Sequence, residues 1–425
     1  MTVKIAIIGG GIGGMTLALS LLDAGFDDVD IFESSSTIME LGVGIMLQPH
    51  AVRELSELGL LDELLAVGIP PTQLAYYTKL GQLIWSEPRG LAAGYSWPTI
   101  AIHRGQLLGI LHRAVLARLG GSHVHTGHHL ADFGQHDSVV WGEFVDRTTR
   151  AAVGSVETDL LVGCDGIHSV LRQTLYADEG PPLWNGVIMC RGVTVCRPLA
   201  SARTSYIAGY SGRQVVVFPI SKRHEDKGEA LINWVAKFKS EEGQPMSKQD
   251  WDHTARLDEV LAPFSSFVFD FLDIPALVRG AETIYQYPMV DRDPLPTWDF
   301  GRVTLLGDAA HPMYPQGGNG ASQAIVDARV LARELALQPT VEAAVAAYDG
   351  VRRPATAAVV LSNRRGGPER VQDIVEERAP NGSANLDDVI SLQEMEEIIG
   401  GYKRITGADR DALNQRPSLS VPRYF

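Results

Sequence analysis

The sequence predicts an α/β fold: a domain built on a parallel sheet, interrupted by a second domain built on an antiparallel sheet. A glycine-rich turn joins an apolar strand to a helix close to the N-terminus. Apolar strands far downstream also end in short Gly/Asp turns, and residues 186–238 alternate as antiparallel strands do. The 425 residues are long enough for two to three domains.

The first turn carries a phosphate-binding pattern. An apolar strand over residues 3–8 is followed by Gly9, Gly11 and Gly14, which fill the places of G-x-G-x-x-G, and by a helix over residues 15–24. These glycines allow a tight turn, close approach of a pyrophosphate and close packing of the helix on the strand. The helix N-terminus adds unpaired N–H groups and a favourable dipole. We therefore expect a dinucleotide here.

The end of the next strand narrows the choice of dinucleotide. Glu33 follows an apolar strand over residues 29–32 and lies 19 positions after Gly14. An acid at that distance accepts hydrogen bonds from the adenosine ribose hydroxyls and disfavours a 2′-phosphate. FAD and NAD both remain open for this site, whereas NADP does not fit it.

A second pattern indicates what else the ligand carries. A strand over residues 302–306 leads into Gly307 and Asp308, then into a glycine-rich loop and an amphipathic helix over residues 321–336. A carboxylate beside a helix N-terminus suits a polyol chain and an electron-rich ring edge. A domain that bound only NAD has no need of this second site. A helix-capping role remains the alternative for Asp308.

A third apolar strand, over residues 160–164, leads into Asp165 and Gly166 and then into another helix. Asp165 also has helix capping as its alternative. For Arg172, on that helix, the alternative is a solvated surface charge, and we expect His311 to satisfy a buried hydrogen bond.

Together these motifs resemble those of the single-component FAD-dependent aromatic hydroxylases, the para-hydroxybenzoate hydroxylase class. The likeness covers about residues 3–365 and is greatest to phenazine-biosynthesis flavin monooxygenase-like proteins. The residues that carry it are the three glycines, Asp165-Gly166 with Ser169 and Arg172, and Gly307-Asp308-Ala309-Ala310-His311.

The resemblance implies a Rossmann-type FAD-binding domain with an inserted antiparallel β-sheet substrate domain and a C-terminal helical region. We expect the FAD-binding domain to be discontinuous, over residues 1–72, 99–180 and 282–365. The substrate-binding domain is expected over residues 73–98 and 181–281. Residues 366–425 are expected to form outer helices or a partly ordered tail.

The resemblance also implies roles for single residues. FAD would be tightly bound, with NADH or NADPH as a transient co-substrate. Asp308 would hold the ribityl chain, and Pro315 would lie near the reactive edge of the flavin. Arg191 is a candidate contact for a substrate anion or the flavin, with a structural ion pair as its alternative. The cofactor-binding residues implied are Gly9, Gly11, Gly14, Glu33, Arg104, Asp165, Gly307, Asp308, Gly318, Asn319, Gly320 and Ala321.

The function implied is that of an NAD(P)H-consuming monooxygenase. It would hydroxylate a small aromatic or N-heteroaromatic substrate through a flavin C4a-hydroperoxide, without a catalytic metal. Two alternatives remain open: a flavin oxidase or dehydrogenase that inserts no oxygen, and a non-enzymatic FAD-binding redox sensor. Product mass with ¹⁸O₂ separates the first alternative from a monooxygenase.

Charge and composition exclude other classes. Lys and Arg total 37 against 51 Asp and Glu, a net charge of −14, which argues against nucleic acid or an anionic membrane as the main partner. Three cysteines are too few for a disulfide scaffold. We see no N-terminal targeting segment and no apolar run of about 18 residues. A cytoplasmic monomer or homodimer is therefore expected.

Overall fold

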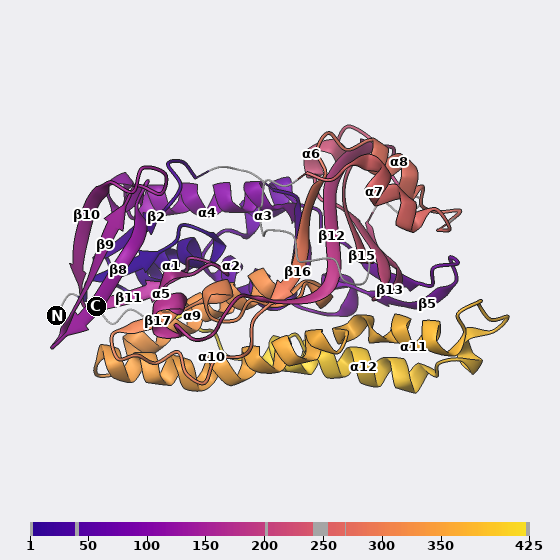
Figure 1. The fold of residues 1–425 in the computed structure, drawn as a ribbon. Helices are drawn as coiled ribbons and strands as arrows, with labels where there is room; N and C mark the ends of the chain where they lie inside the picture. Colours follow the sequence, from indigo (N-terminus) through magenta and orange to yellow (C-terminus); the bar gives the residue numbers. More distant parts are fainter. Residues whose placement is uncertain (1–2, 39–41, 200–202, 241–253, 268, 422–425) are drawn as a thin grey trace.

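A five-stranded parallel sheet organises one half of the fold. The computed structural model describes residues 3–38, 42–199, 203–240, 254–267 and 269–421. The central strand β1 (Ile5–Ile8) pairs with β2 (Val29–Glu33) on one side and with β11 (Leu160–Gly163) on the other, and the second pairing joins segments about 155 residues apart. Strands β2 and β11 lie in the left half of the view in Figure 1. The strands, in spatial order, are β17 (Val303–Leu305), β11 (Leu160–Gly163), β1 (Ile5–Ile8), β2 (Val29–Glu33) and β7 (Val124–Thr126).

Helices and a second small sheet enclose these strands. Helix α1 (Ile12–Asp23) packs between α4 (Arg104–Arg118) and α9 (Gly320–Leu337). An antiparallel sheet contacts β1, β2 and β11, and its Phe144 stacks on Phe32 at 4.3 Å between ring centroids. Its strands are β8 (His129–His136), β9 (Val139–Val145) and β10 (Ala152–Thr158).

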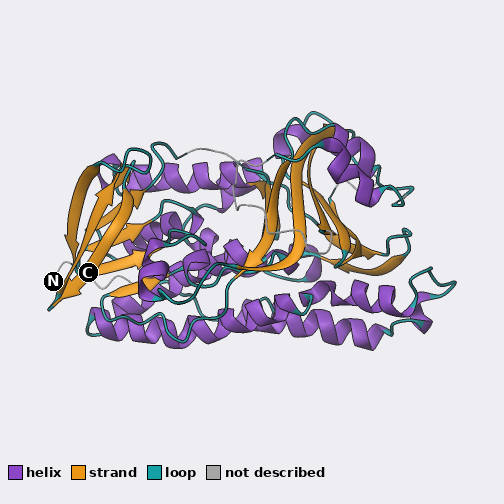
Figure 2. Ribbon diagram, viewed as in Figure 1, coloured by secondary structure: helices purple, strands orange, loops and turns teal. Residues whose placement is uncertain are grey.

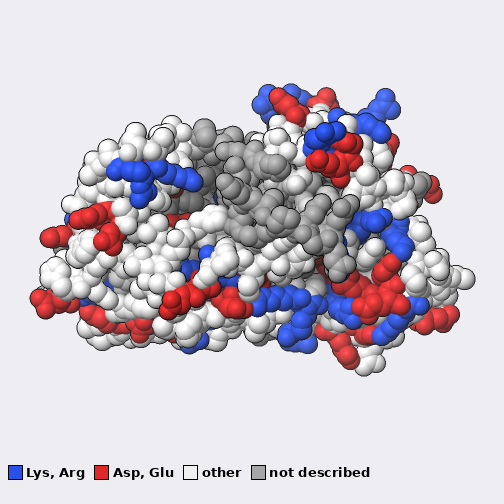
Figure 3. Space-filling model, viewed as in Figure 1, with Lys and Arg blue, Asp and Glu red and all other residues white. Residues whose placement is uncertain are grey.

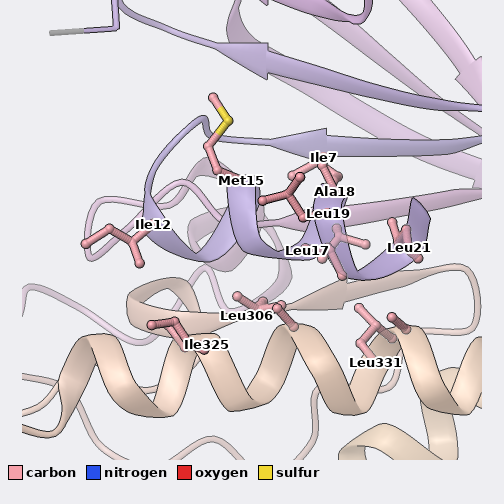
Figure 4. Packing of buried hydrophobic residues seen from close by; sticks show 14 of the residues in the cluster. Ile7, Ile12, Met15, Leu17, Ala18, Leu19, Leu21, Leu306, Ile325 and Leu331 are labelled. Carbon is pink, nitrogen blue, oxygen red and sulfur yellow. The ribbon is translucent and has the colours of Figure 1, made fainter. Parts of the chain in front are cut away.

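The core between α1 and α9 is close-packed. Leu306, from the end of β17, lies between the two helices and faces the side chains of α1, including Leu17 (Figure 4). A Cβ added at Gly13 would lie 2.8 Å from Leu306 Cδ2, so the glycine lets α1 approach this side chain. This packing fixes the N-terminal ends of α1 and α9 relative to each other.

A seven-stranded mixed sheet forms the other half of the fold (Figure 2). All neighbouring strands are antiparallel except β13 and β4, which pair in parallel. The four strands expected between residues 186 and 238 lie in this sheet. In spatial order the strands are β16 (Tyr285–Asp291), β12 (Leu183–Cys196), β15 (Ala230–Lys239), β14 (Arg213–Pro219), β13 (Thr204–Tyr210), β4 (Gln73–Tyr77) and β5 (Leu83–Pro88).

Strand β16 belongs to this sheet although it follows residue 282, where we expected the FAD-binding segment to resume. It pairs antiparallel with β12, and Ile188 lies opposite Pro288. The charged connection over residues 221–228 contains a short helix, α6 (Lys222–Glu225). The domain boundaries themselves remain a prediction.

The remaining short elements connect these layers. They are β3 (Gly44–Leu47) and β6 (Ile100–His103), which pair antiparallel, and the helices α2 (Pro49–Glu57), α3 (Leu61–Val67), α5 (Val170–Leu175), α7 (Leu257–Leu261) and α8 (Ile274–Arg279).

The C-terminal region is helical and runs beneath both halves of the fold (Figure 1). Helix α10 (Val341–Arg364) is followed by α11 (Arg370–Arg378), α12 (Leu392–Ile405) and α13 (Arg410–Gln415). Most of residues 370–415 thus lie in helices, joined by short irregular segments. After α13 the chain is anchored by Ser418 Oγ, which donates to Glu57 Oε2 at 2.8 Å.

The surface along these helices carries both signs of charge. Basic and acidic side chains alternate along the edge formed by α10, α11 and α12 (Figure 3), and Arg378 pairs there with Glu394. Among the described residues, no helix has the length and apolar character that crossing a membrane requires.

Candidate active site

A cavity of about 780 Å³ runs between the parallel sheet and the seven-stranded sheet. Every residue predicted above for the site lines this cavity except Gly14. Residues from the whole length of the chain meet here, from Ile8 at the end of β1 to Ala408 after α12.

The first glycine turn lets neighbouring backbone segments approach one another closely. Gly9 has φ +108°, and a Cβ there would lie 2.4 Å from the carbonyl oxygen of Cys164. Gly14 does not face the cavity, because it packs α1 against the strand: its Cβ would lie 2.0 Å from Gly9 O. A Cβ at Gly11, in contrast, would have no atom within 4 Å. The N-terminus of α1 therefore opens onto free space.

Glu33 is held beside this turn. Its Oε2 accepts the N–H of Gly10 at 2.8 Å, and its Oε1 accepts the N–H of Ser35 at 2.7 Å. Two backbone bonds fix the carboxylate at the end of β2. A ribose near the turn would meet acceptors that are already positioned.

Asp165 lies below the same turn. Its Oδ2 accepts the N–H of Val170 at 2.7 Å, whereas its buried Oδ1 has no partner among the described residues. Burial raises the pKa of the Asp165 carboxyl to about 6. The N-cap of α5 is Ser169, whose Oγ accepts the N–H of Arg172 at 3.0 Å.

Arg172 connects the second motif to the third. It is 1% exposed rather than solvated, and its Nη1 donates to the carbonyl oxygens of Ala310 (2.8 Å) and Ala309 (3.1 Å). Its guanidinium also bonds the carboxylate of Glu179. Arg172 therefore positions the Gly307–His311 turn.

A buried network supports that turn from behind. His311 Nε2 lies 2.5 Å from Asp327 Oδ2, and Arg352 Nε donates to Asp327 Oδ1 at 2.6 Å. Burial would raise the pKa of the Asp327 carboxyl, yet His311 and Arg352 hold it below its usual value. His311 thus satisfies a buried bond, as expected.

Asp308 differs from its neighbours because it faces the cavity. Within the part of the chain that the structure describes, its carboxylate makes no hydrogen bond, so it caps no helix there. The surrounding protein raises the pKa of the Asp308 carboxyl, while His311 and Arg104 oppose the rise. An acceptor left without a protein partner suits a ligand hydroxyl.

The loop over residues 313–320 is held by side chains that the sequence did not single out for a role. Gln48 Nε2 donates to Gly317 O at 3.0 Å, and Tyr402 Oη donates to Gln316 O at 2.8 Å. Asn363 Nδ2 donates to the carbonyl oxygen of Tyr314 at 2.7 Å. Two of these three residues come from the C-terminal helices α10 and α12.

Arg191 also lines the cavity. Its Nη2 donates to Gly44 O at 2.6 Å, and its Nη1 donates to Tyr287 Oη at 3.3 Å. It has no carboxylate partner in the described ranges, and its buried Nε has no acceptor there. The expected alternative, a structural ion pair, is therefore not what the structure has.

The part of the cavity that is lined by the seven-stranded sheet and α12 has mostly apolar walls and a few charged groups. The charged side chains come from β5, β12, β15 and the C-terminal region. The apolar lining residues are Leu74, Tyr76, Ile207, Val216, Phe218, Val235 and Ile399.

The arrangement fits FAD. Two helix N-termini, those of α1 and α9, open onto one cavity, and a Cβ at Gly320 would also meet no atom within 4 Å. Asp308, without a protein hydrogen bond, and the buried Asn319 Oδ1, without a partner among the described residues, offer acceptors. A pyrophosphate and a polyol each have a place in this arrangement.

Comparison with known proteins gives the family. The FAD binding domain family model matches residues 2–362. The chain is 42% identical over 361 residues to phenazine 1,6-dicarboxylic acid hydroxylase of Lysobacter antibioticus, covering 85% of this chain and 89% of that one. It is 30% identical to 6-hydroxynicotinate 3-monooxygenase of Bordetella bronchiseptica, over 78% and 82% of the two chains.

Solved structures agree on the fold. A salicylate hydroxylase substrate complex superposes with a TM-score of 0.72 at 25% identity, over 98% of this chain and 99% of that one. A single-residue variant of Klebsiella pneumoniae HpxO in complex with FAD superposes with a TM-score of 0.75 at 23% identity, over 96% of this chain and 99% of that one. The expected α/β FAD-binding fold with a helical C-terminal region is confirmed.

The chain therefore belongs to the FAD binding domain family. Within it, the protein is an FAD-dependent monooxygenase that uses NADH or NADPH as co-substrate.

Proposed function

We propose that this monooxygenase hydroxylates a small aromatic or N-heteroaromatic substrate. The observation that carries the proposal is the continuity of one cavity from the glycine turn of α1 to the apolar end below the seven-stranded sheet. Relatives named for phenazine, hydroxynicotinate and salicylate substrates support it.

FAD, when bound, supplies the redox chemistry: it accepts a hydride from the nicotinamide and activates O₂. The residues of the chain position it. We assign the pyrophosphate to Gly9 and Gly11 with the N-terminus of α1, and the ribose to Glu33. Asp308 would accept from the ribityl hydroxyls, and Arg104 would add a positive charge beside them.

The ring system would rest on the loop that leads into α9. Asn319, Gly320 and Ala321 present backbone N–H groups at the N-terminus of an 18-residue helix, which favours negative charge on the ring edge. Gly318 donates its own N–H to Pro315 O at 3.0 Å and would lie against the ring through its backbone. Pro315 would face the reacting side. Gly307 and Asp165 would act by positioning the backbone around the cofactor.

Water must be kept from the reacting atoms, because exposure to water would divert the activated oxygen to H₂O₂. The apolar walls, among them Ile207, Val216 and Phe218, serve this purpose. Arg191 would contact the substrate or the cofactor from β12.

We also propose that the enzyme is cytoplasmic and works as a monomer or homodimer, without nucleic acid or membrane as a partner. The net charge of −14 supports the absence of nucleic acid and membrane partners, since both of those partners attract basic surfaces.

The deciding experiment supplies ¹⁸O₂ and NADH or NADPH to the holoenzyme with a panel of aromatic acids and N-heteroaromatics. We expect one ¹⁸O atom in the product and substrate-stimulated consumption of the nicotinamide. Oxidation of a substrate without ¹⁸O incorporation would instead establish an oxidase or dehydrogenase. Absence of any substrate-stimulated consumption would favour a redox sensor.

A further inference from the structure

The wall of the cavity that α12 forms carries charges that the roles above do not use. Lys403 Nζ donates to Glu87 Oε2 at 2.8 Å, and Arg89 Nη1 donates to Glu87 Oε1 at 3.1 Å. The Glu87 side chain is only 7% exposed, and all three residues line the cavity. Two cations therefore share one buried carboxylate.

Both cations keep donors for a further partner. Arg89 uses one more N–H, from Nη2 to Gln48 Oε1 at 2.8 Å. Lys403 Nζ makes no other hydrogen bond within the described part of the chain. Burial would raise the pKa of the Glu87 carboxyl, but Arg89 and Lys403 outweigh it and hold the pKa below its usual value. The group of three thus keeps one net positive charge.

The wider surroundings add to this charge. Lys237 is matched by Glu369 at 3.1 Å, while Arg191 has no carboxylate partner among the described residues. The described charged side chains at this end of the cavity are four cations (Arg89, Arg191, Lys237 and Lys403) and two anions (Glu87 and Glu369). Two positive charges therefore remain uncompensated, in a chain whose net charge is −14.

Lys403 also has a fixed position relative to the loop over residues 313–320, which we call the cofactor loop. Its neighbour Tyr402 donates to Gln316 O at 2.8 Å and accepts from Asn319 Nδ2 at 3.2 Å. A Cβ at Gly317 would lie 2.4 Å from the Tyr402 ring, so α12 and the loop are in tight contact. Helix α12 lies beyond residue 362, where the match to the family model ends.

We propose that the substrate is an aromatic acid whose carboxylate binds between Lys403 and Arg89. This inference rests on the proposed function, whose substrate class it narrows. A carboxylate accepts one N–H from each cation, and such charge-assisted bonds are short and strong. The ring then lies against the apolar walls, including Ile399 of α12.

Titration calorimetry of the wild-type holoenzyme gives the first test. The probes are phenazine-1,6-dicarboxylic, 6-hydroxynicotinic and salicylic acids, each paired with its own carboxamide. We expect at least one acid to bind about 10- to 100-fold more tightly than its amide, the effect of a charge-assisted hydrogen bond. If no acid binds more tightly than its amide, the assignment is overturned.

Three variants locate the binding group. Lys403→Gln should lose about 10- to 100-fold in acid affinity while amide affinity stays unchanged. Lys403→Arg keeps the charge and should keep the preference for the acid. Arg404→Gln is the matched control, because Arg404 is the exposed neighbour on α12 and does not line the cavity. Equal losses for acid and amide in Lys403→Gln, or no loss of acid affinity, contradict the proposal.

Two further outcomes separate this inference from the proposed function. If Lys403→Gln no longer retains FAD, the carboxylate assignment is decided by two other results: the acid and amide affinities of the wild type, and the acid preference of Lys403→Arg. Acid-selective binding without ¹⁸O incorporation would remove the proposed function and leave this binding site. Hydroxylation of neutral aromatics only would support the proposed function and overturn the carboxylate-binding site.

Discussion

Two carboxylates at strand ends show that the hydrogen-bond partners around a side chain determine the role it is suited to. Asp165 and Asp308 both follow an apolar strand of the parallel sheet, and burial raises the pKa of both carboxyls. Asp165 is engaged by the N–H of Val170, whereas Asp308 has no hydrogen bond from the described chain. The first is therefore suited to shaping the turn, and the second to binding a ligand.

Asp308→Ala should weaken retention of FAD. Removal of a charged acceptor for a ribityl hydroxyl costs about 1.5–3 kcal/mol, which is roughly 10- to 150-fold in affinity. Titration of FAD into the two apoproteins measures the change. Asp388→Ala, an exposed position on the C-terminal region, is the control and should leave affinity unchanged. Unchanged FAD affinity in Asp308→Ala together with a loss of about 1 kcal/mol in stability would mean a helix-capping role.

At the scale of elements, α12 acts on the cofactor loop rather than only covering the fold. Tyr402 Oη is the centre of this contact, with Gln316 O and Asn319 Nδ2 as neighbours. From the other side, Glu369 Oε1 accepts the N–H of Gly317 at 3.3 Å. The loop is thus held by residues more than 50 positions downstream.

Tyr402→Phe should loosen the loop without unfolding the protein. The loss of these bonds costs about 1 to 3 kcal/mol, so amides of residues 316–320 should exchange with deuterium roughly 5- to 150-fold faster. Hydrogen-exchange mass spectrometry of the holoenzyme measures this rate.

Tyr95→Phe is the matched control for this substitution. Tyr95 Oη donates to Ala408 O at 2.7 Å, on the same C-terminal segment but away from the loop. In Tyr95→Phe, the rate of deuterium exchange over residues 316–320 should equal that of the wild type. Faster exchange in both variants would indicate a general loss of stability instead.

The sequence predicted which residues gather at the glycine-turn end of the cavity, because the signals for that turn are local; their cofactor roles remain predictions. A glycine triplet between a strand and a helix predicts a tight phosphate-binding turn. Gly9, Gly11 and Glu33 lie together at the cavity as expected. The role of Arg172 was not predictable, because its partners Ala309 and Ala310 are about 137 positions away.

The substrate end was less predictable for the same reason. The pairing of β13 with β4 joins residues about 130 positions apart, and no local pattern encodes it. The helix α12 did have a signal: Ser391 caps it by accepting the N–H of Glu394, a typical S-x-x-E start. That capping pattern did not indicate that Tyr402 and Lys403 would face the cavity.

For the whole molecule, the shared cavity has a kinetic consequence. Nicotinamide and aromatic substrate must reach one FAD in turn, and reduction without substrate would waste NAD(P)H. We expect the true substrate to speed anaerobic reduction of bound FAD by at least about tenfold, which requires about 1.4 kcal/mol of preference for the reducible state. Anaerobic stopped-flow absorbance measures it. Equal rates with and without a hydroxylated substrate would contradict this expectation and leave FAD binding unaffected.

The order of pairing in the parallel sheet has a consequence for synthesis on the ribosome. Strand β1 is made first, but its neighbour β11 starts at Leu160, and β17 completes that side of the sheet from Val303. At 5–20 residues per second, β17 emerges roughly 15 to 60 s after β1. Throughout that time the nascent chain carries an apolar strand edge with no partner, which invites aggregation. FAD can be held fully only once α12 has also been made, because Tyr402 of that helix holds the loop over residues 313–320. Slower growth at lower temperature and chaperone supply should therefore raise the yield of yellow protein more than added flavin does.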